Sequence, residues 1–299
     1  MSSDRQIPLK HKIEYIIVKA TLKGFKYMPE SFIYGFTNFI ALLFFKLEKR
    51  HRIITIKNLE IAFPEKSSKD IAKLAEKSYA SLSKTIAEII LIYNDRYDIN
   101  SHIVNHKEVF AKLKDIQKSN GIVFATAHFS NWELLAQVFA VNDFKMLGIG
   151  RKGTNYLIEE NITKPFRQKY GNVLAYKDLA ILKIVKRLKK NQCVGILMDQ
   201  KAGGAGVSTT FFGREVDTVS SVATLKLKYN PLIIPIFLAR QKDGKYKIEM
   251  YDPIELPDKI SLSDEEKISK IVQQYNDILE DVIKKYPEQW FWMHNRWRL

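Results

Sequence analysis

The chain has 299 residues, of which 46% are hydrophobic, so it is long and apolar enough to bury a core and is not typical of a disordered protein. Its 48 Lys and Arg against 33 Asp and Glu give a formal net charge of +15, which favours anionic partners such as nucleic acid, anionic lipid or an acidic carrier protein. Cys193 is the single cysteine, which excludes an intrachain disulfide, and its apolar neighbours predict a core position.

The N-terminal part of the chain contains an apolar and aromatic stretch at residues 31–45. The stretch falls short of the ~20 residues that a spanning helix needs, and basic residues flank it on both sides. A helix lying in a membrane interface is therefore favoured, with a buried core helix as the alternative. The residues before it lack a secretory signal, so we expect the body of the protein to stay in the cytoplasm. A second helix, capped by Ser67 or Ser68, is predicted to pack on the core.

The stretch at residues 121–135 combines a strand, a polar turn and the start of a helix. Residues 122–127 are apolar, which is typical of a strand covered on both faces, and His128 follows them. Ser130 and Glu133 have the spacing of a capping box, which predicts a helix that begins near Ser130. With His128 in the turn and Glu133 in the first helical turn, the two side chains can meet at the carboxyl edge of the sheet.

A carboxylate beside an imidazole fixes the tautomer of the ring and raises its basicity, as a general base requires. His128 and Glu133 are therefore candidate catalytic residues. The alternative is that Glu133 only caps the helix and that His128 only closes the strand.

Further elements follow this stretch in chain order. A strand at residues 144–149 leads to Arg151 and Lys152, and a helix at residues 155–170 carries Lys164, Arg167 and Lys169. A basic helix is predicted from Asp178 to Lys190. A buried strand at residues 194–198 ends at Asp199, and we interpret the glycines of residues 201–208 as a mobile turn, since they lack phosphate-loop spacing.

The last third of the chain predicts a helix at residues 220–229, a strand at 232–238 interrupted by Pro235, and a half-exposed edge strand at 245–251. A capping box of Ser263 and Glu266 opens a long amphipathic helix that Pro287 stops. The tail holds Trp290, Trp292 and Trp297 beside arginines, which is compatible with a membrane interface, with binding of a base, or with packing on the last helix.

Several of these signals occur together in one known family. The chain resembles the late acyltransferases of lipid A biosynthesis, within the lysophospholipid acyltransferase superfamily, from about residue 50 to the C-terminus. The signals, in the family's order, are Asn58-Leu59, AFPE at 62–65, HFSNWE at 128–133, Arg151-Lys152, Arg167, Asp199-Gln200, Phe211-Phe212-Gly213 and QWFWMHNRW at 289–297.

The resemblance implies an α/β fold with a central mixed, largely parallel sheet flanked by helices, like that of glycerolipid acyltransferases. We expect an N-terminal membrane-associated helical segment at residues 1–52 and one catalytic unit at residues 53–299. The implied reaction moves a fatty acyl chain from an acyl carrier protein thioester to a hydroxyl of a phosphorylated glycolipid such as a lipid A precursor. It is expected at the cytoplasmic face of the bacterial inner membrane, without a metal or redox cofactor.

The residues expected to perform this reaction fall into two groups. His128 is the candidate base and Glu133 is expected to orient it. Basic residues are implied to bind the phosphates of the acceptor, with Arg167 as the best match to the family's functional arginine. The candidate substrate-binding residues are Arg167, Asp199, Arg151, Lys152 and Asn131.

Two alternatives stay open at this point. One is an acyltransferase that acts on another lipid, such as a lysophospholipid. The other is a basic protein without enzymatic activity that binds membrane or nucleic acid. The sequence lacks a recognisable nucleic-acid reading motif, so we expect no nucleic acid partner.

Overall fold

The computed structural model describes residues 7–117, 121–176, 180–204, 206–256 and 262–299. Within these residues, six strands form one sheet in the order β3-β2-β4-β1-β7-β8, in which β8 is antiparallel to β7 and the other neighbours are parallel. The strands are β1 (Ile122–Thr126), β2 (Met146–Gly150), β3 (Val173–Tyr176), β4 (Cys193–Leu197), β7 (Leu232–Arg240) and β8 (Tyr246–Met250). The predicted α/β class, with a largely parallel sheet and an antiparallel edge strand, is confirmed.

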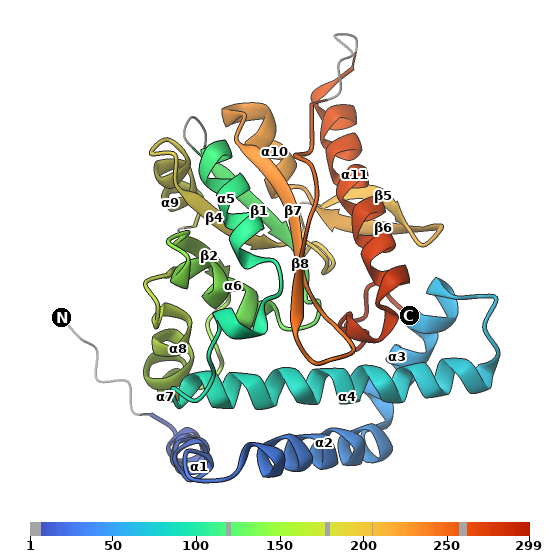
Figure 1. Ribbon diagram of the computed structural model, residues 1–299. Helices are drawn as coiled ribbons and strands as arrows, with labels where there is room; N and C mark the ends of the chain where they lie inside the picture. The colour runs from blue at the N-terminus through green and yellow to red at the C-terminus, as the bar shows by residue number, and fades with distance from the viewer. Residues whose placement is uncertain (1–6, 118–120, 177–179, 205, 257–261) are drawn as a thin grey trace.

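Helices cover both faces of the sheet (Figure 1). One face packs on α5 (His106–Gln117) and α6 (Trp132–Val141), and the other on α9 (Ala180–Leu188), α10 (Ser221–Tyr229) and α11 (Asp264–Lys285). Successive residues of β1 alternate between these two cores, which explains why the strand is apolar at almost every position. The capping box of Ser263 and Glu266 opens α11 as predicted, and Cys193 is buried.

One prediction about strands was wrong, and one pair of strands was missed. Pro235 does not interrupt β7, because it lies opposite Ala125 and just before the pairing with β8 begins at Ile236. The segment after Asp199 also contains a hairpin of β5 (Gly206–Phe211) and β6 (Arg214–Val219) that we had not predicted. Phe212 and Gly213 both have positive φ angles of 50° and 69°, as the two central residues of a tight hairpin turn require.

The segment between β2 and β3 is helical, as predicted, and Asn155 caps it. It runs through α7 (Tyr156–Ile158), a π-helical turn η2 (Glu159–Thr163) and α8 (Lys164–Gln168). The predicted basic helix corresponds to α9, whereas its expected first residue, Asp178, lies outside the described residues.

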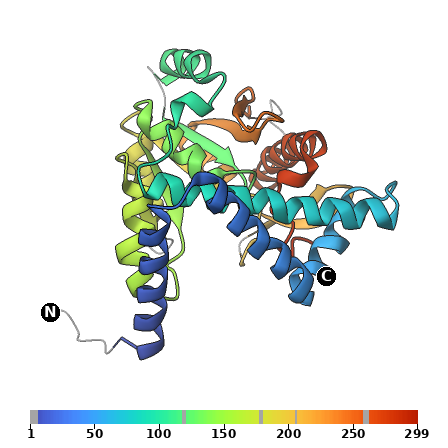
Figure 2. The ribbon, with the colours of Figure 1, turned by 60° about the horizontal axis from the view of Figure 1, so that its bottom comes forward.

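The chain begins with the helices α1 (Leu9–Phe25), α2 (Glu30–Leu47), α3 (Lys49–Ala62) and α4 (Ser68–Tyr93), the last capped by Ser67. α4 passes along the carboxyl edge of the sheet, and α2 packs on the side of α4 that faces away from it (Figures 1 and 2). The 18 residues of α2 bury only Ile33 and Thr37, and its exposed side chains include Phe32, Phe36 and Phe39. Among the described helices, α2 alone is long and apolar enough to cross a membrane by length and composition.

The C-terminal tail packs against the core. A short helix, η4 (Pro287–Gln289), leads to Trp290 and Trp292, which are both buried, as is Arg296. The Arg296 guanidinium donates hydrogen bonds to the Asp217 carbonyl and the Thr218 hydroxyl of β6. The packing alternative for the tail is therefore correct, and its buried tryptophans are not available to a membrane or a base.

Candidate active site

His128 lies in the turn after β1, and the C-terminal tail forms hydrogen bonds with the backbone of this turn. The amide of Phe291 donates to the carbonyl of His128 at 2.9 Å, and the amide of Ser130 donates to the carbonyl of Gln289 at 2.6 Å. Ser130 has a φ of 50°, a left-handed conformation that serine rarely adopts. The tail and the turn thus fix each other, although the two segments are far apart in the sequence.

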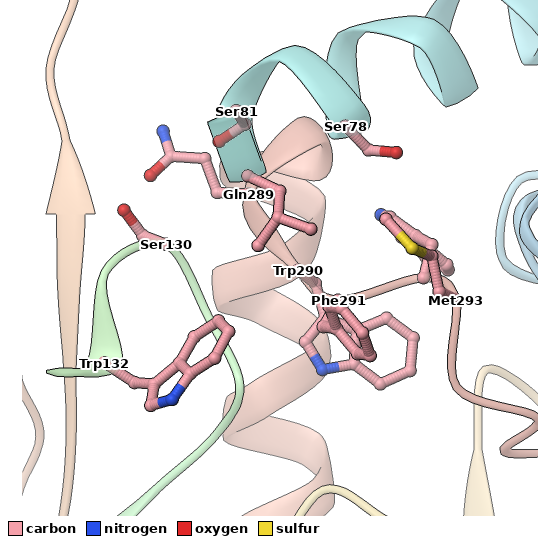
Figure 3. A pocket seen from close by; sticks show the side chains of 10 residues that line it. Ser78, Ser81, Ser130, Trp132, Gln289, Trp290, Phe291 and Met293 are labelled. Carbon is pink, nitrogen blue, oxygen red and sulfur yellow. The ribbon is translucent and has the colours of Figure 1, made fainter. Parts of the chain in front are cut away.

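α4 supports the same turn from the other side. Figure 3 shows Ser78 and Ser81 of α4, Ser130 of the turn, Trp132 at the start of α6, and the tail residues gathered around one small cavity. The hydroxyl of Thr85 on α4 also donates to the carbonyl of Ser130 at 3.0 Å. The His128 turn is therefore clamped between α4 and the tail, which leaves its backbone little freedom.

The carboxylate of Asp199 holds the imidazole of His128. Its Oδ1 lies 2.9 Å from His128 Nδ1, and its Oδ2 accepts from the His128 amide and from Trp290 Nε1, both at 3.0 Å. Strands β1 and β4 are parallel neighbours that pair Thr126 with Leu197, so the residues that follow them come together at the edge of the sheet. Asp199 is only 2% exposed, whereas the His128 side chain is 24% exposed.

This arrangement differs from the expected one, in which Glu133 orients His128 and Asp199 binds substrate. The oxygens of Asp199 are occupied by His128 and Trp290, and no hydrogen bond joins His128 to Glu133 among the described contacts. The carboxylate that fixes the ring is thus 71 positions away in the sequence, not five. With Nδ1 held by Asp199, the other ring nitrogen, Nε2, is left to accept a proton.

The charges around His128 change its pKa. Burial alone lowers the pKa of the imidazole, but the charge and hydrogen bond of Asp199, with a smaller contribution from Glu133, raise it above the ordinary 6.5. For Asp199, burial raises the pKa of the carboxyl group, but the interactions with His128 and Trp290 outweigh burial. The pKa of Asp199 therefore lies below its usual range. The ring is therefore a stronger base than a free histidine and Asp199 stays ionised.

Glu133 lies in the first turn of α6 and pairs with Arg167 of α8. Arg167 Nε is 3.1 Å from both carboxylate oxygens and Nη2 is 2.5 Å from Oε1, so the guanidinium grips the carboxylate with two nitrogens. The predicted capping box is wrong, because Glu133 turns toward Arg167 and Asn131 caps α6 by accepting from the amide of Leu134. The left-handed conformation of Ser130 places that residue outside the capping position.

Asn131 cannot be a direct substrate ligand in this structure, contrary to expectation. It is fully buried, and its amide nitrogen donates to Glu88 of α4 at 2.7 Å. Glu88 also pairs with Arg240 and accepts from Tyr246, both buried. Asn131 therefore ties the first turn of α6 to a buried polar network behind the site.

The remaining basic candidates differ in how free they are. Lys164 pairs with Glu160, and Lys169 pairs with Asp95 and donates to the carbonyls of Ile92 and Tyr93. Neither lysine lines the cavity at His128, whereas Arg151 and Arg167 do. Arg151 and Lys152 follow β2 and are exposed. The Lys152 ammonium lies 5.3 Å from the centre of the Tyr176 ring.

A cavity of about 880 Å³ opens at His128 and is lined by Glu133, Arg151 and Arg167 as well. On the α6 side it reaches the buried residues Phe124, Phe139 and Met146, and on the other side it runs between α9 and α10. Gly148 and Gly195 lie on adjacent strands beneath α6, and a Cβ at Gly195 would come 2.6 Å from Met146 Sδ. The absence of side chains at these positions keeps the cavity open. Among the described residues, no group of three His, Cys, Asp or Glu side chains is arranged to hold a metal ion.

Comparison with known proteins identifies the family. The bacterial lipid A biosynthesis acyltransferase family matches residues 3–299. The chain is 28% identical to the lipid A biosynthesis lauroyltransferase of Escherichia coli (strain K12), over 91% of this chain and 87% of that protein. It is 26% identical to the lipid A biosynthesis acyltransferase of Haemophilus influenzae (85% of this chain, 79% of the relative) and to the palmitoleoyltransferase of Escherichia coli (84% and 79%). The chain therefore belongs to the bacterial lipid A biosynthesis acyltransferase family.

Proposed function

We propose that this acyltransferase moves a fatty acyl chain from an acyl carrier protein thioester to a hydroxyl of a phosphorylated lipid A precursor, with His128 as the general base. The observation that carries the proposal is the pairing of His128 with Asp199 at the mouth of a cavity lined by two arginines and a deep apolar wall. A base, a phosphate site and an apolar site are what this reaction requires in one place.

The chemical step follows from the orientation of the ring. His128 Nε2 takes the proton of the acceptor hydroxyl as its oxygen attacks the thioester carbonyl, so that the new C–O bond forms directly. When the C–S bond breaks, the imidazolium returns the proton to the leaving thiolate, and no acyl-enzyme forms. Asp199 stabilises the imidazolium between these two events. General-base catalysis supplies about 10²–10⁴-fold, so positioning of both substrates must supply much of the remaining rate enhancement.

Arg167 and Arg151 are the residues we assign to the phosphates of the acceptor, with Lys152 nearby. Glu133 would then act by holding the Arg167 guanidinium at the mouth of the cavity, and its charge also supports the basicity of His128. The acyl chain would lie along the α6 side, where Phe124, Phe139 and Met146 form an apolar wall. The cavity volume of about 880 Å³ lies within the range of about 300–1,000 Å³ that is typical of small-molecule sites.

The N-terminal segment, residues 1–52, would hold the enzyme on the cytoplasmic face of the inner membrane. α2 exposes phenylalanines, with Phe39 62% exposed, and α1 exposes Leu9, Ile16 and Ile17 among several lysines. Apolar side chains beside lysines suit an interface with anionic headgroups. Residues 53–299 would form the catalytic unit.

The test is an assay of the purified protein with a radiolabelled acyl carrier protein thioester and a phosphorylated lipid A precursor in detergent micelles. The unaltered protein should transfer the label to the lipid, and folded His128→Ala should lose nearly all transfer. Mass spectrometry of lipid A from cells that lack the protein should show the loss of one acyl chain. Near-normal transfer by folded His128→Ala would contradict the general-base mechanism, and transfer to a lysophospholipid but not to the lipid A precursor would contradict the acceptor.

A further inference from the structure

The side of α9 that faces away from the sheet is basic and partly apolar, and the site described above leaves it unused. Lys183, Lys186, Lys189 and Lys190 are all exposed, on α9 and directly after it. Leu182 is 72% exposed and Ile181 is 54% exposed on the same helix. The residues of α9 include no Asp or Glu, so nothing on the helix itself offsets this charge.

This surface is continuous with the active-site cavity. Ile181 lines the cavity as well as facing solvent, and α10 contributes Lys228 and Tyr229 to the cavity lining across from α9. The α9–α10 arm of the cavity extends to the carboxyl edge of the sheet, where Gln200, Lys201 and His128 line it. The cavity therefore connects the solvent beside Ile181 of α9 and Lys228 and Tyr229 of α10 with the catalytic base.

We infer that the exposed face of α9, with Lys228 and Tyr229 of α10, is the docking surface for the acidic acyl carrier protein that delivers the acyl thioester. The inference rests on the proposed function. The lysines are complementary in charge to an acidic protein, and the exposed apolar residues between them supply the contact area that charges alone do not. The adjoining arm of the cavity then provides a path for the thioester toward His128.

The position of α9 favours a protein partner over the bilayer. In Figure 1, α9 lies at the upper left, whereas α1 and α2 lie along the bottom of the molecule, with α7 and α8 between them. The apolar residues exposed on α2 and those on α9 thus belong to different regions of the surface. A carrier protein on α9 and a lipid acceptor arriving from the α1–α2 side would reach the cavity from different directions.

The decisive experiment is a charge reversal, Lys183→Glu with Lys186→Glu and Lys189→Glu, in the full-length protein. Exposed lysines contribute little to the fold, so the triple variant should remain folded. The KM for the acyl carrier protein thioester should rise about tenfold or more, because several attractive pairs are replaced by repulsive ones. The rate with an acyl-pantetheine thioester, which has no protein part, should stay within about twofold. In the unaltered protein, rising salt should raise the KM for the carrier protein thioester more than the KM for the acyl-pantetheine thioester.

A matched control is Lys69→Glu with Lys73→Glu and Lys77→Glu. These lysines are exposed near the start of α4, at the lower right of Figure 1, and the control changes the net charge by the same amount. It should leave the KM for the carrier protein thioester nearly unchanged. An equal increase of this KM in both variants would show that the effect depends on net charge alone and would overturn the assignment to α9.

Two further outcomes separate this inference from the proposed function. If the α9 variant transfers acyl chains from the carrier protein with an unchanged KM, the docking surface is wrong while the function stands. Loss of membrane partitioning with that KM unchanged would assign α9 to the bilayer instead. Binding of the carrier protein, followed by fluorescence anisotropy, needs no turnover. If the unaltered protein binds the carrier protein but transfers no acyl chain, and the α9 variant does not bind it, the docking surface is supported and the proposed function is rejected.

Discussion

Replacing Asp199 by asparagine tests the central feature of the site, because the change keeps the size of the side chain and removes its charge. Asparagine can still accept from Trp290 and the His128 amide through its oxygen, so the fold should persist. Its NH₂ group would then face His128 Nδ1, which favours the tautomer that carries its proton on Nε2. In that tautomer Nε2 cannot take a proton from the acceptor.

The size of the effect follows from the geometry. At an effective dielectric constant of about 20, an imidazolium 2.9 Å from a carboxylate oxygen is stabilised by about 5–6 kcal/mol. At about 1.4 kcal/mol for each factor of ten, this corresponds to roughly four orders of magnitude in rate. The equivalent change in a serine protease triad costs about 10⁴ in kcat, so we expect a loss of about 10³–10⁴ in kcat for Asp199→Asn.

The assay is initial-rate transfer with saturating donor and acceptor, accompanied by circular dichroism and a thermal unfolding curve. Asp217→Asn is the matched control, because it makes the same chemical change in an aspartate that pairs with Arg298, away from His128. It should keep nearly full activity. A folded Asp199→Asn protein with a kcat within tenfold of the unaltered enzyme would refute the assignment of Asp199 as the residue that orients the base.

Four further predictions concern the site and its surroundings. Since the pKa of His128 is raised and the neutral ring is the active form, kcat/KM should increase with pH through a midpoint above 6.5. A midpoint below 6.5 would contradict this prediction. Burial lowers the pKa of His294 to about 4, so the His294 ring should not contribute to the midpoint. Glu133→Gln and Arg167→Ala should each raise the KM for the acceptor by about tenfold. The double variant should have nearly the same KM as either single variant, because the two residues act as one unit. Additive effects of the two changes on this KM would argue against the pairing. Asn131→Ala should lower the free energy of unfolding by about 1–3 kcal/mol in denaturant titrations, because the helix loses its cap and Glu88 loses a hydrogen-bond partner. A variant of normal stability with a raised KM for the acceptor would instead indicate that Asn131 binds substrate. Phe39→Glu on α2 should shift the protein from the membrane to the soluble fraction after cell lysis. A high-salt wash of the unaltered protein should release it only in part, since salt screens only the electrostatic contribution. Unchanged partitioning of Phe39→Glu would show that the membrane contact lies elsewhere.

Local patterns in the sequence were sufficient for most of the elements. The apolar runs that became β1, β4 and β7 predicted strands, with β1 covered on both faces, and the capping residues Ser67 and Ser263 marked the starts of α4 and α11. The hairpin of β5 and β6 was missed because its strands mix polar and apolar residues without strict alternation, and because its glycines suggested only a mobile turn. The positive φ angles at Phe212 and Gly213 are the local feature that closes it.

The sequence by itself determined the family, the α/β class and the position of His128 at the carboxyl end of a buried strand. These follow from local spacing and from motifs in a fixed order, which need no knowledge of distant contacts. Only the tertiary structure determined which carboxylate meets the imidazole. Glu133 is five residues from His128, but the geometry of the first turn of α6 directs it to Arg167, while the parallel pairing of β1 with β4 brings Asp199 to the ring. A parallel sheet places the ends of its strands side by side whatever their separation in the chain, so the partners at its edge depend on strand order, which short-range patterns do not encode.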